Sequence, residues 1–390
     1  MLLVVCTAAA GAGKADGQAV SGPASAPASR PAAAPAPPLA AWGRQVLDQI
    51  DKDLRVPGTG LYAEWLKADG RRGNDFGKLS FVWPAGFQFR ALAAAARVQP
   101  DTYGKPLTDF AKALDAYWAV RDGLDGYMVL TSRSERFYDD NAWIALGMIE
   151  THQITRREEY LKRAIEALAF VASGEAKTPG GGIRQHEDKP GPSSICTTAP
   201  TAVAALRLYR ITHDRKYLAD GERWYAWLTS PEVGVQDPAD GLFDDQAAFV
   251  DGKWTVRRGK RAYNSALPLQ AAVLLFQIRE DPKYLRQAQR IAAAALTRWV
   301  RPSGAMKETG QWGGGDLVDA LCDLYDADHD PRWLAAVRSI LRYVHDHGRD
   351  PNGRYGEYWN VDRRTMPLEE CKLLYMAPVA RAFWRAARYP

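Results

Sequence analysis

Two neighbouring aspartates are the residues whose types and spacing could do chemistry. Asp139 and Asp140 stand within the run Tyr138–Trp143, and an apolar pattern with helical spacing begins directly after them. Asp and Asn are favoured at helix N-termini, where their oxygens accept free backbone N–H groups, so helix capping is one interpretation. The other is a general acid and a nucleophile at the start of one helix. The run by itself leaves both interpretations open.

Adjacent positions are compatible with the second interpretation. Consecutive Cα atoms lie ~3.8 Å apart, and retaining cleavage of a glycosidic bond needs carboxyl groups about 5–5.5 Å apart. Side chains that leave a helix start in different directions can reach that separation. Two like charges this close resist simultaneous ionisation, so we expect one aspartate to keep its proton longer than the other.

Composition limits the class of protein. The chain has 390 residues, 46% of them hydrophobic, which suffices for one large domain or two ordinary ones. The net charge of +5 is scattered along the chain, so nucleic acid is not an expected partner. Cys6, Cys196, Cys322 and Cys371 lie far apart and the histidines do not cluster with them, which predicts neither a disulfide framework nor a metal site. Nothing in the sequence calls for an organic cofactor.

The N-terminal segment is typical of export. Residues 1–16 resemble a truncated secretory or lipoprotein leader, with Cys6 as a candidate lipidation site. Residues 17–38 are rich in Ala and Pro and predict a disordered linker. We therefore expect a secreted or periplasmic protein, attached to a membrane only if Cys6 carries lipid, and monomeric. A cytosolic protein with an inert tail is the alternative.

The body at residues 39–390 repeats a pair of helices. An apolar helix ends in a short polar turn, and an aromatic–Leu pair then opens a second helix. Five such pairs, a helix at Leu39–Leu54 and a helix at Leu368–Arg388 predict an all-α (α/α)6 barrel, a toroid of six helical hairpins, with an open solenoid as the alternative. The turns that define the repeat are Ile154–Arg157, Ile211–Asp214, Ile278–Asp281 and Ala327–Asp330, with a weaker copy at Pro100–Tyr103.

The long loops predict which residues share a cleft. Residues 174–194, 230–262 and 301–315 each follow the second helix of a pair, so they emerge on the face where the first helices, and therefore Asp139 and Asp140, begin. Polar and aromatic side chains on one rim favour a site for sugar rings. The predicted substrate-binding residues are Trp83, Tyr138, Asn141, Arg184, Gln185, His186, Tyr263, Asn264, Trp312 and Trp359.

Four stretches resemble glycoside hydrolase family 76. They are Tyr138–Trp143, the glycine run Gly180–Ile183, the turn Leu206–Thr212 and the pair Tyr263–Asn264, and they occur in that family's order. The similarity covers nearly the whole body after the linker. Where the family often has two tryptophans after its glycine run, residues 184–186 are Arg, Gln and His.

This resemblance implies a fold and a reaction. The family is a barrel of six helix pairs that cleaves α-1,6-mannan with retention of configuration, and no metal or cofactor is implied. Asp139 matches the family's nucleophile and Asp140 its acid/base. The expected partner is a polysaccharide or oligosaccharide substrate.

Two other functions fit the same pattern. Sugar 2-epimerases and uronyl hydrolases also use barrels of helix pairs, but epimerases rely on paired histidines and only His186 is predicted at the mouth. A glycan-binding lipoprotein without catalysis would keep the aromatic residues and tolerate loss of both aspartate side chains.

Overall fold

The computed structural model describes residues 38–389 except residues 122, 134, 308 and 309. The predicted leader, Cys6 and the linker up to residue 37 lie outside the described residues, so they stay predictions.

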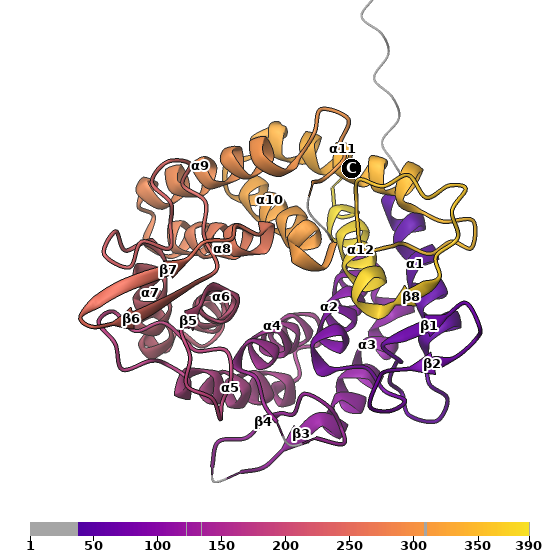
Figure 1. Cartoon of the computed structure of the whole chain (residues 1–390), viewed down its shortest axis with the longest axis horizontal. Helices are drawn as coiled ribbons and strands as arrows, with labels where there is room; N and C mark the ends of the chain where they lie inside the picture. Colours follow the sequence, from indigo (N-terminus) through magenta and orange to yellow (C-terminus); the bar gives the residue numbers. More distant parts are fainter. Residues whose placement is uncertain (1–37, 122, 134, 308–309, 390) are drawn as a thin grey trace, which may run out of the picture. The chain divides into compact units, whose positions relative to one another are not determined.

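Six helices form a closed inner ring (Figure 1). Each packs on the next one along the chain, and the last packs on the first. These helices are buried on most of their faces, as expected for apolar helices enclosed by others. Closure of the ring excludes an open solenoid and confirms the predicted all-α (α/α)6 barrel. The inner helices are α2 (Val82–Val98), α4 (Tyr138–Thr155), α6 (Ile195–Thr212), α8 (Ala262–Arg279), α10 (Gly315–Asp328) and α12 (Leu373–Ala386).

Six outer helices each pack on one inner helix. The first outer helix packs on α12, which completes the sixth pair from the two ends of the described chain, and the others pack on α2, α4, α6, α8 and α10 in turn. They bury one face only, which matches their amphipathic sequences. The outer helices are α1 (Leu39–Leu54), α3 (Pro100–Ala113), α5 (Glu158–Ser173), α7 (Arg215–Thr229), α9 (Pro282–Trp299) and α11 (Pro331–Gly348), and a short 3-10 helix, η1 (Leu114–Tyr117), follows α3.

The four repeated turns share one geometry. Each inner helix before such a turn ends in a non-glycine residue with left-handed backbone, with φ between 55° and 60°. That residue redirects the chain, and in three turns an aspartate then accepts the backbone N–H two residues later to begin the outer helix. The left-handed residues are Arg156, His213, Glu280 and His329, and the capping aspartates are Asp214, Asp281 and Asp330.

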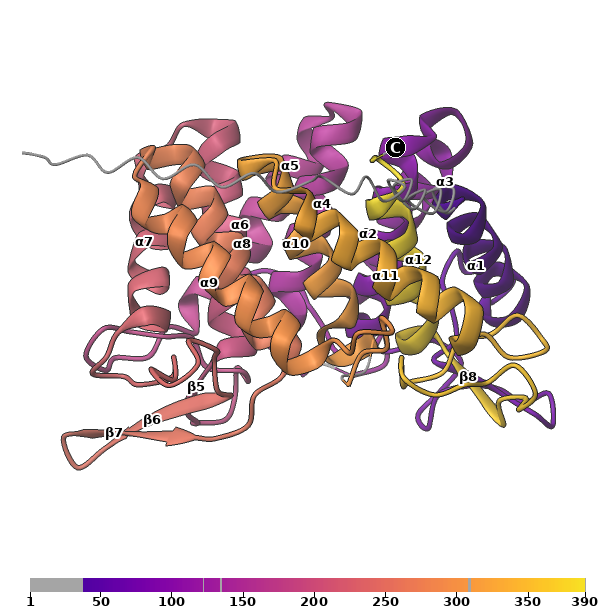
Figure 2. The same cartoon turned by 90° about the horizontal axis from the view of Figure 1, so that it is seen from above.

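Short antiparallel strands lie on the face of the ring opposite the repeated turns (Figure 2). The helical pattern of the sequence did not predict these strands. One sheet has the order β2-β1-β8, a second pairs β3 with β4, and a third has the order β5-β6-β7. Their bounds are β1 (Trp65–Lys67), β2 (Arg72–Gly73), β3 (Trp118–Ala119), β4 (Gly126–Tyr127), β5 (Ser193–Ser194), β6 (Gln246–Val250), β7 (Lys253–Arg257) and β8 (Glu370–Lys372).

One of these strands corrects a helix boundary. The C-terminal helix was predicted at Leu368–Arg388, but α12 spans Leu373–Ala386. The three residues before it pair with β1 as β8, so their backbone groups are satisfied by a strand and the helix begins later.

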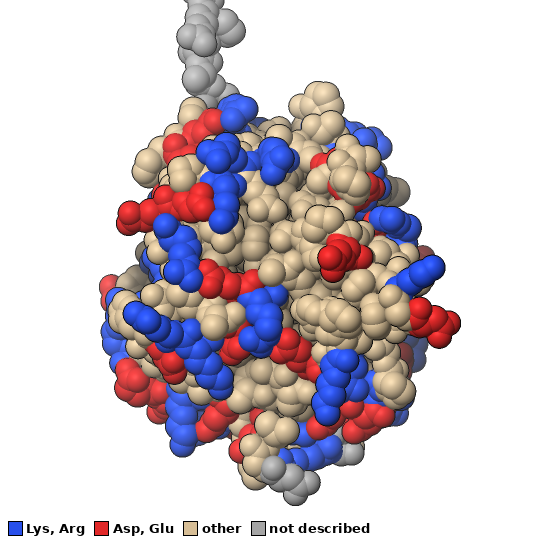
Figure 3. Space-filling view, turned by 90° about the vertical axis from the view of Figure 1, so that its left-hand side faces the viewer, with Lys and Arg blue, Asp and Glu red and all other residues tan. Residues whose placement is uncertain are grey.

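The face in Figure 3 carries side chains of both charge signs. Lysines and arginines alternate there with aspartates and glutamates. Among the described residues, no helix combines the length and apolar composition that crossing a bilayer requires.

Candidate functional site

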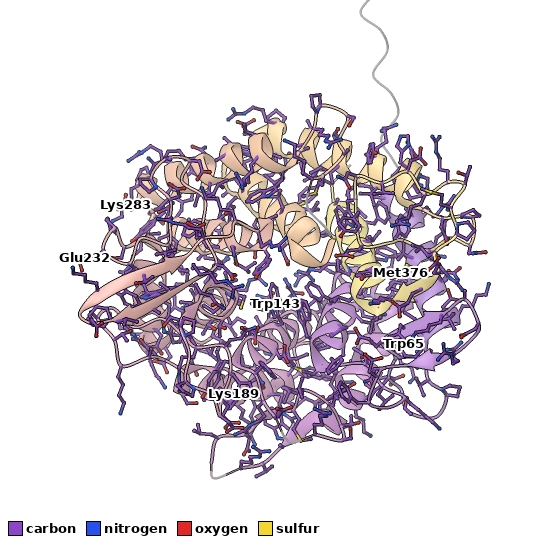
Figure 4. All side chains as sticks on the ribbon, in the orientation of Figure 1. Trp65, Trp143, Lys189, Glu232, Lys283 and Met376 are labelled. Carbon is purple, nitrogen blue, oxygen red and sulfur yellow. The ribbon has the colours of Figure 1, made fainter. Side chains whose placement is uncertain are left out.

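A pocket of about 250 Å³ opens on the strand-decorated face of the ring. Five inner helices each contribute their second residue to its wall, because all six inner helices begin on this face. These residues are Trp83, Asp139, Cys196, Tyr263 and Asp316. The rest of the lining is Phe81, Phe87, Val129, Phe137, Asp140, Trp143 and Gln185. In Figure 4 Trp143 lies on the inner side of the ring.

Asp139 is a half-buried carboxyl group with defined partners. Its Oδ2 atom accepts a hydrogen bond from Gln185 Nε2 at 2.9 Å and a longer one from Cys196 Sγ at 3.5 Å. Burial raises the pKa of Asp139 to about 6, although hydrogen bonds from Gln185, Cys196 and backbone N–H groups hold it down. Its Oδ1 atom is buried and has no hydrogen-bond partner among the described groups.

Asp140 lies deeper, with 8% of its surface exposed. Burial raises its pKa well above the usual range, and the neighbouring charge of Asp139 raises it further. Asp139 therefore ionises first and Asp140 keeps its proton to higher pH. The first turn of α4 thus offers a carboxylate and a carboxylic acid side by side, which are the two forms that nucleophilic attack and proton donation require.

An aromatic wall stands beside the two aspartates. The rings of Phe87 and Trp143 lie 5.6 Å apart and those of Trp83 and Phe87 lie 6.0 Å apart, measured between ring centroids. Such a wall presents flat apolar faces, and the C–H face of a sugar ring packs on surfaces of this kind. Tyr263 lies on the wall as well, and burial raises the pKa of its hydroxyl.

Asp316 closes the pocket on the side of α10. Arg90 Nη1 lies 3.6 Å from its Oδ1 atom. Burial raises the pKa of Asp316 to about 6, against the opposing effect of the Arg90 charge. The pocket therefore contains a third acidic group. Its partner Arg90 also lies 3.4 Å from Glu150 and from Asp319, so Asp316 belongs to a cluster of buried ion pairs inside the ring.

The structure brings five of the twelve predicted site residues to the pocket wall. These are Trp83, Asp139, Asp140, Gln185 and Tyr263. Arg184 and His186 lie close by without lining it. The Nε atom of Arg184 donates to the carbonyl oxygen of Gly174 at 3.4 Å, and the ring of His186 packs edge-on against Phe137 with centroids 4.5 Å apart.

Four predicted substrate-binding residues are buried and are not among the residues that line the pocket. Tyr138 is buried with its ring 4.9 Å from that of Phe170. Asn141 is buried and bridges the backbone of Tyr127, accepting its N–H at 2.6 Å and donating to its carbonyl at 3.0 Å. Tyr138 therefore packs against the outer helix α5, and Asn141 is bonded to β4.

Asn264 and Trp359 are the other two predicted residues that are buried outside the pocket lining. Asn264 has no exposed surface, and Trp359 is 2% exposed and packs on Gly310 and Gly314. These two glycines belong to η2 (Gly310–Gly314), a π-helical turn before α10. The side chain of Trp312, in the same turn, lies outside the described residues.

Sequence reasoning missed several lining residues. Cys196 and Asp316 occupy the same helix position as Asp139, so aligning the starts of the inner helices would have found them. The remaining ones are Phe81, Phe87, Val129, Phe137 and Trp143, apolar residues for which core packing was the simpler interpretation. Within the described part of the chain, no group of three or more His, Cys, Asp or Glu side chains could hold a metal ion.

Comparison with known proteins places the chain in a family. The family model described as glycosyl hydrolase family 76 matches residues 60–317. The chain belongs to this family. An α-mannanase of family 76 from Bacteroides thetaiotaomicron has a similar structure, with a TM-score of 0.82 at 30% identity over 90% of this chain and 96% of that one.

More distant relatives share the fold. The α-1,6-mannanase of a Salegentibacter species has a TM-score of 0.75 at 20% identity, covering 90% of this chain and 99% of that one. Cellobiose 2-epimerase from Bacillus thermoamylovorans has a TM-score of 0.68 at 16% identity, with coverage of 88% and 98%. The meiotically up-regulated gene 191 protein of Schizosaccharomyces pombe is 25% identical over 228 residues, which are 54% of this chain. The chain spans about half the length of that protein, 49%.

Proposed function

We propose that this member of family 76 is a retaining glycoside hydrolase that cleaves α-mannosidic linkages, with α-1,6-mannan as the substrate class. The observation that carries the proposal is the pair Asp139 and Asp140 at one pocket wall, with environments that separate their protonation states. Family membership supplies the reaction type, and the family resemblance supplies the order of the two roles.

The proposed reaction uses the pair twice. In the first step the carboxylate of Asp139 attacks the anomeric carbon, while Asp140 gives its proton to the glycosidic oxygen that leaves. In the second step Asp140 takes a proton from water, and that water attacks the same carbon and releases Asp139. Configuration is retained because two inversions occur at one carbon.

Related structures support a mannan-type substrate. The relative from Bacteroides thetaiotaomicron at 30% identity is described as an α-mannanase. An inactive variant of the Salegentibacter enzyme, with two neighbouring aspartates replaced by asparagine, is described in complex with α-1,6-mannotriose. The aromatic wall of Trp83, Phe87 and Trp143 offers stacking surface for such a saccharide.

Epimerisation of a free sugar is disfavoured by the pocket itself. The epimerase mechanism depends on paired histidines, and no histidine is among the described residues that line the pocket. A glycan-binding protein without catalysis would bind mannan and produce no reducing ends, so the experiment below also tests that alternative.

The decisive experiment replaces each aspartate separately. Asp139→Asn removes the nucleophile, and we expect activity on both α-1,6-mannan and an activated aryl α-mannoside to fall to background. Asp140→Asn removes the proton donor, and we expect turnover of mannan to fall by about 10²–10⁴-fold. The aryl substrate should suffer less, because its leaving group needs little protonation. NMR of the first-formed product should show the α-anomer.

A matched substitution tests whether the loss of any carboxylate charge on this face lowers turnover. Asp240→Asn changes a carboxylate on the same face of the ring that bonds Lys260 at 2.8 Å and does not line the pocket. We expect it to retain near wild-type turnover. The assignment is wrong if Asp139→Asn or Asp140→Asn behaves in the same way.

A location outside the cytoplasm also stays a proposal, based on the export-like residues 1–16 and the linker after them. Fractionation of cells that express the full chain would test it, with the protein expected in the periplasm, on the membrane surface or in the medium.

A further inference from the structure

A second cavity of about 380 Å³ occupies the opposite end of the ring. Residues from the C-terminal halves of all six inner helices line it, so it lies at the end of the ring that carries the short turns. Glu150, one of its lining residues, lies eleven positions after Asp139 on α4, which is about 16 Å along the helix. The cavity is therefore separate from the pocket that holds the aspartate pair.

Arginines dominate the lining of this turn-side cavity. Six arginines face three carboxylates, so positive charges outnumber negative ones. The inner arginines are paired: Arg381 Nη1 lies 2.9 Å from Glu150 Oε2, and Arg385 Nη2 lies 2.5 Å from Asp323 Oδ1. The six arginines are Arg97, Arg207, Arg210, Arg381, Arg385 and Arg388, and the third carboxylate is that of Asp326.

The arginines nearest to solvent have weaker partners. Among the described residues, Arg97 donates to the amide oxygen of Gln153 at 3.2 Å and Arg210 to that of Gln277 at 2.7 Å. Neither Arg97 nor Arg210 has a carboxylate within ion-pair distance among the described residues. Arg388 has one only at 3.9 Å, on Asp326. Partial burial lowers the pKa of Arg97, and the positive charges of three neighbouring arginines lower it further.

The C-terminal ends of the inner helices explain only part of this accumulation of arginines. The C-terminus of each helix carries a partial negative charge of roughly half a unit, which favours cations near it. That effect is strongest for the arginines close to the last backbone carbonyls. It gives no reason for guanidinium groups from three different helices to converge on one open cavity.

We propose that the turn-side cavity binds a small multivalent oxyanion, either a phosphate-bearing compound or a polycarboxylate. The guanidinium group presents paired N–H donors that match both phosphate and carboxylate oxygens. The volume lies within the range of roughly 300–1,000 Å³ that small-molecule sites occupy. A single bound anion can accept from Arg97, Arg210 and Arg388 together and balance the excess charge.

Calorimetric titration of the full chain tests this proposal. Sodium pyrophosphate and sodium citrate are titrated separately, with ionic strength held constant by sodium chloride so that charge screening does not change. We expect saturable binding of one anion per chain. The double substitution Arg97→Gln and Arg210→Gln should lower the affinity for the anion at least tenfold, because both guanidinium groups are lost.

A control with the same change in net charge accompanies the experiment. Arg286→Gln with Arg298→Gln removes two exposed arginines of the outer helix α9, away from the cavity, and we expect unchanged affinity. Circular dichroism checks that each variant is folded. The anion that binds more tightly identifies the class of ligand. Absence of saturable binding for both anions, or equal affinity in the Arg97/Arg210 variant, would overturn the proposal.

Discussion

Asp139 and Asp140 are identical in type and adjacent in sequence, yet the pocket makes them different acids. Asp139 is partly open and accepts hydrogen bonds from Gln185 and Cys196, whereas Asp140 is buried beside a like charge. Burial raises the pKa of both groups, but hydrogen bonds to Asp139 offset part of the rise, whereas the neighbouring charge raises the pKa of Asp140 further. At the residue scale, hydrogen bonding and burial therefore divide the proposed roles.

The pH dependence of activity follows from these environments. Because Asp139 must be ionised, kcat/KM should rise with pH through about 6, the pKa of that group. It should fall at higher pH, as Asp140 loses the proton it has to donate. A pH profile on α-1,6-mannan measures both limbs.

Gln185 gives this profile a specific test. Its hydrogen bond favours the ionised form of Asp139, so Gln185→Ala should raise the pKa of Asp139 and move the acidic limb to higher pH. Gln45→Ala, an exposed amide on α1, is the control and should leave the limb in place. An acidic limb that does not move in Gln185→Ala would contradict the role of Asp139.

At the scale of elements, the two ends of the inner helices differ: five helix starts line the pocket, and four helix ends carry the repeated turns. The second residues of five inner helices meet in the pocket because the ring aligns these helix starts. The opposite ends of α4, α6, α8 and α10 turn through a left-handed residue, which a side chain with Cβ adopts at a cost of about 1–2 kcal/mol.

Glu280 is the clearest place to measure that cost. It is exposed, has φ of 55° and ends α8. Glu280→Gly should raise the free energy of unfolding by about 0.5–1 kcal/mol, because glycine adopts this conformation without strain. Ala169→Gly, at an exposed position within α5, should lower it by about 1 kcal/mol. Urea denaturation measures both, and destabilisation by Glu280→Gly would refute the strain argument.

At the scale of the whole ring, buried ion pairs tie distant helices together. Arg381 of α12 lies 2.6 Å from Asp319 of α10 and 2.9 Å from Glu150 of α4. Arg90 of α2 reaches Asp319 at 3.4 Å. Removing one partner leaves a buried charge without compensation, which costs far more than losing a surface pair.

Asp319→Ala should therefore lower the free energy of unfolding by about 3–5 kcal/mol, since Arg90 and Arg381 both lose a partner. Asp69→Ala, which breaks an exposed pair with Arg71, should leave it almost unchanged. Comparison of the two by chemical denaturation measures the difference. Similar values for both variants would show that the cluster is not a major source of stability.

Much of the fold could be predicted from local patterns. The repeated turns, the helix Leu39–Leu54 and the pairing of helices follow from capping residues and apolar spacing, which act within a few positions. The sequence predicted the aspartate pair for the same reason, since both residues lie in one turn. Cys196 and Asp316 lie far along the chain, so no local pattern connected them with Asp139.

By itself, then, the sequence determined that twelve helices form pairs and that two acidic groups begin one of them. Only the tertiary structure decided which residues of this helix start face the pocket. Asp139 and Trp143 line it, whereas Tyr138 packs against α5 and Asn141 is bonded to β4. The physical reason is that a helix places successive side chains about 100° apart, so their surroundings depend on the helices packed on each face. Closure of the ring fixes those faces through contacts between residues hundreds of positions apart.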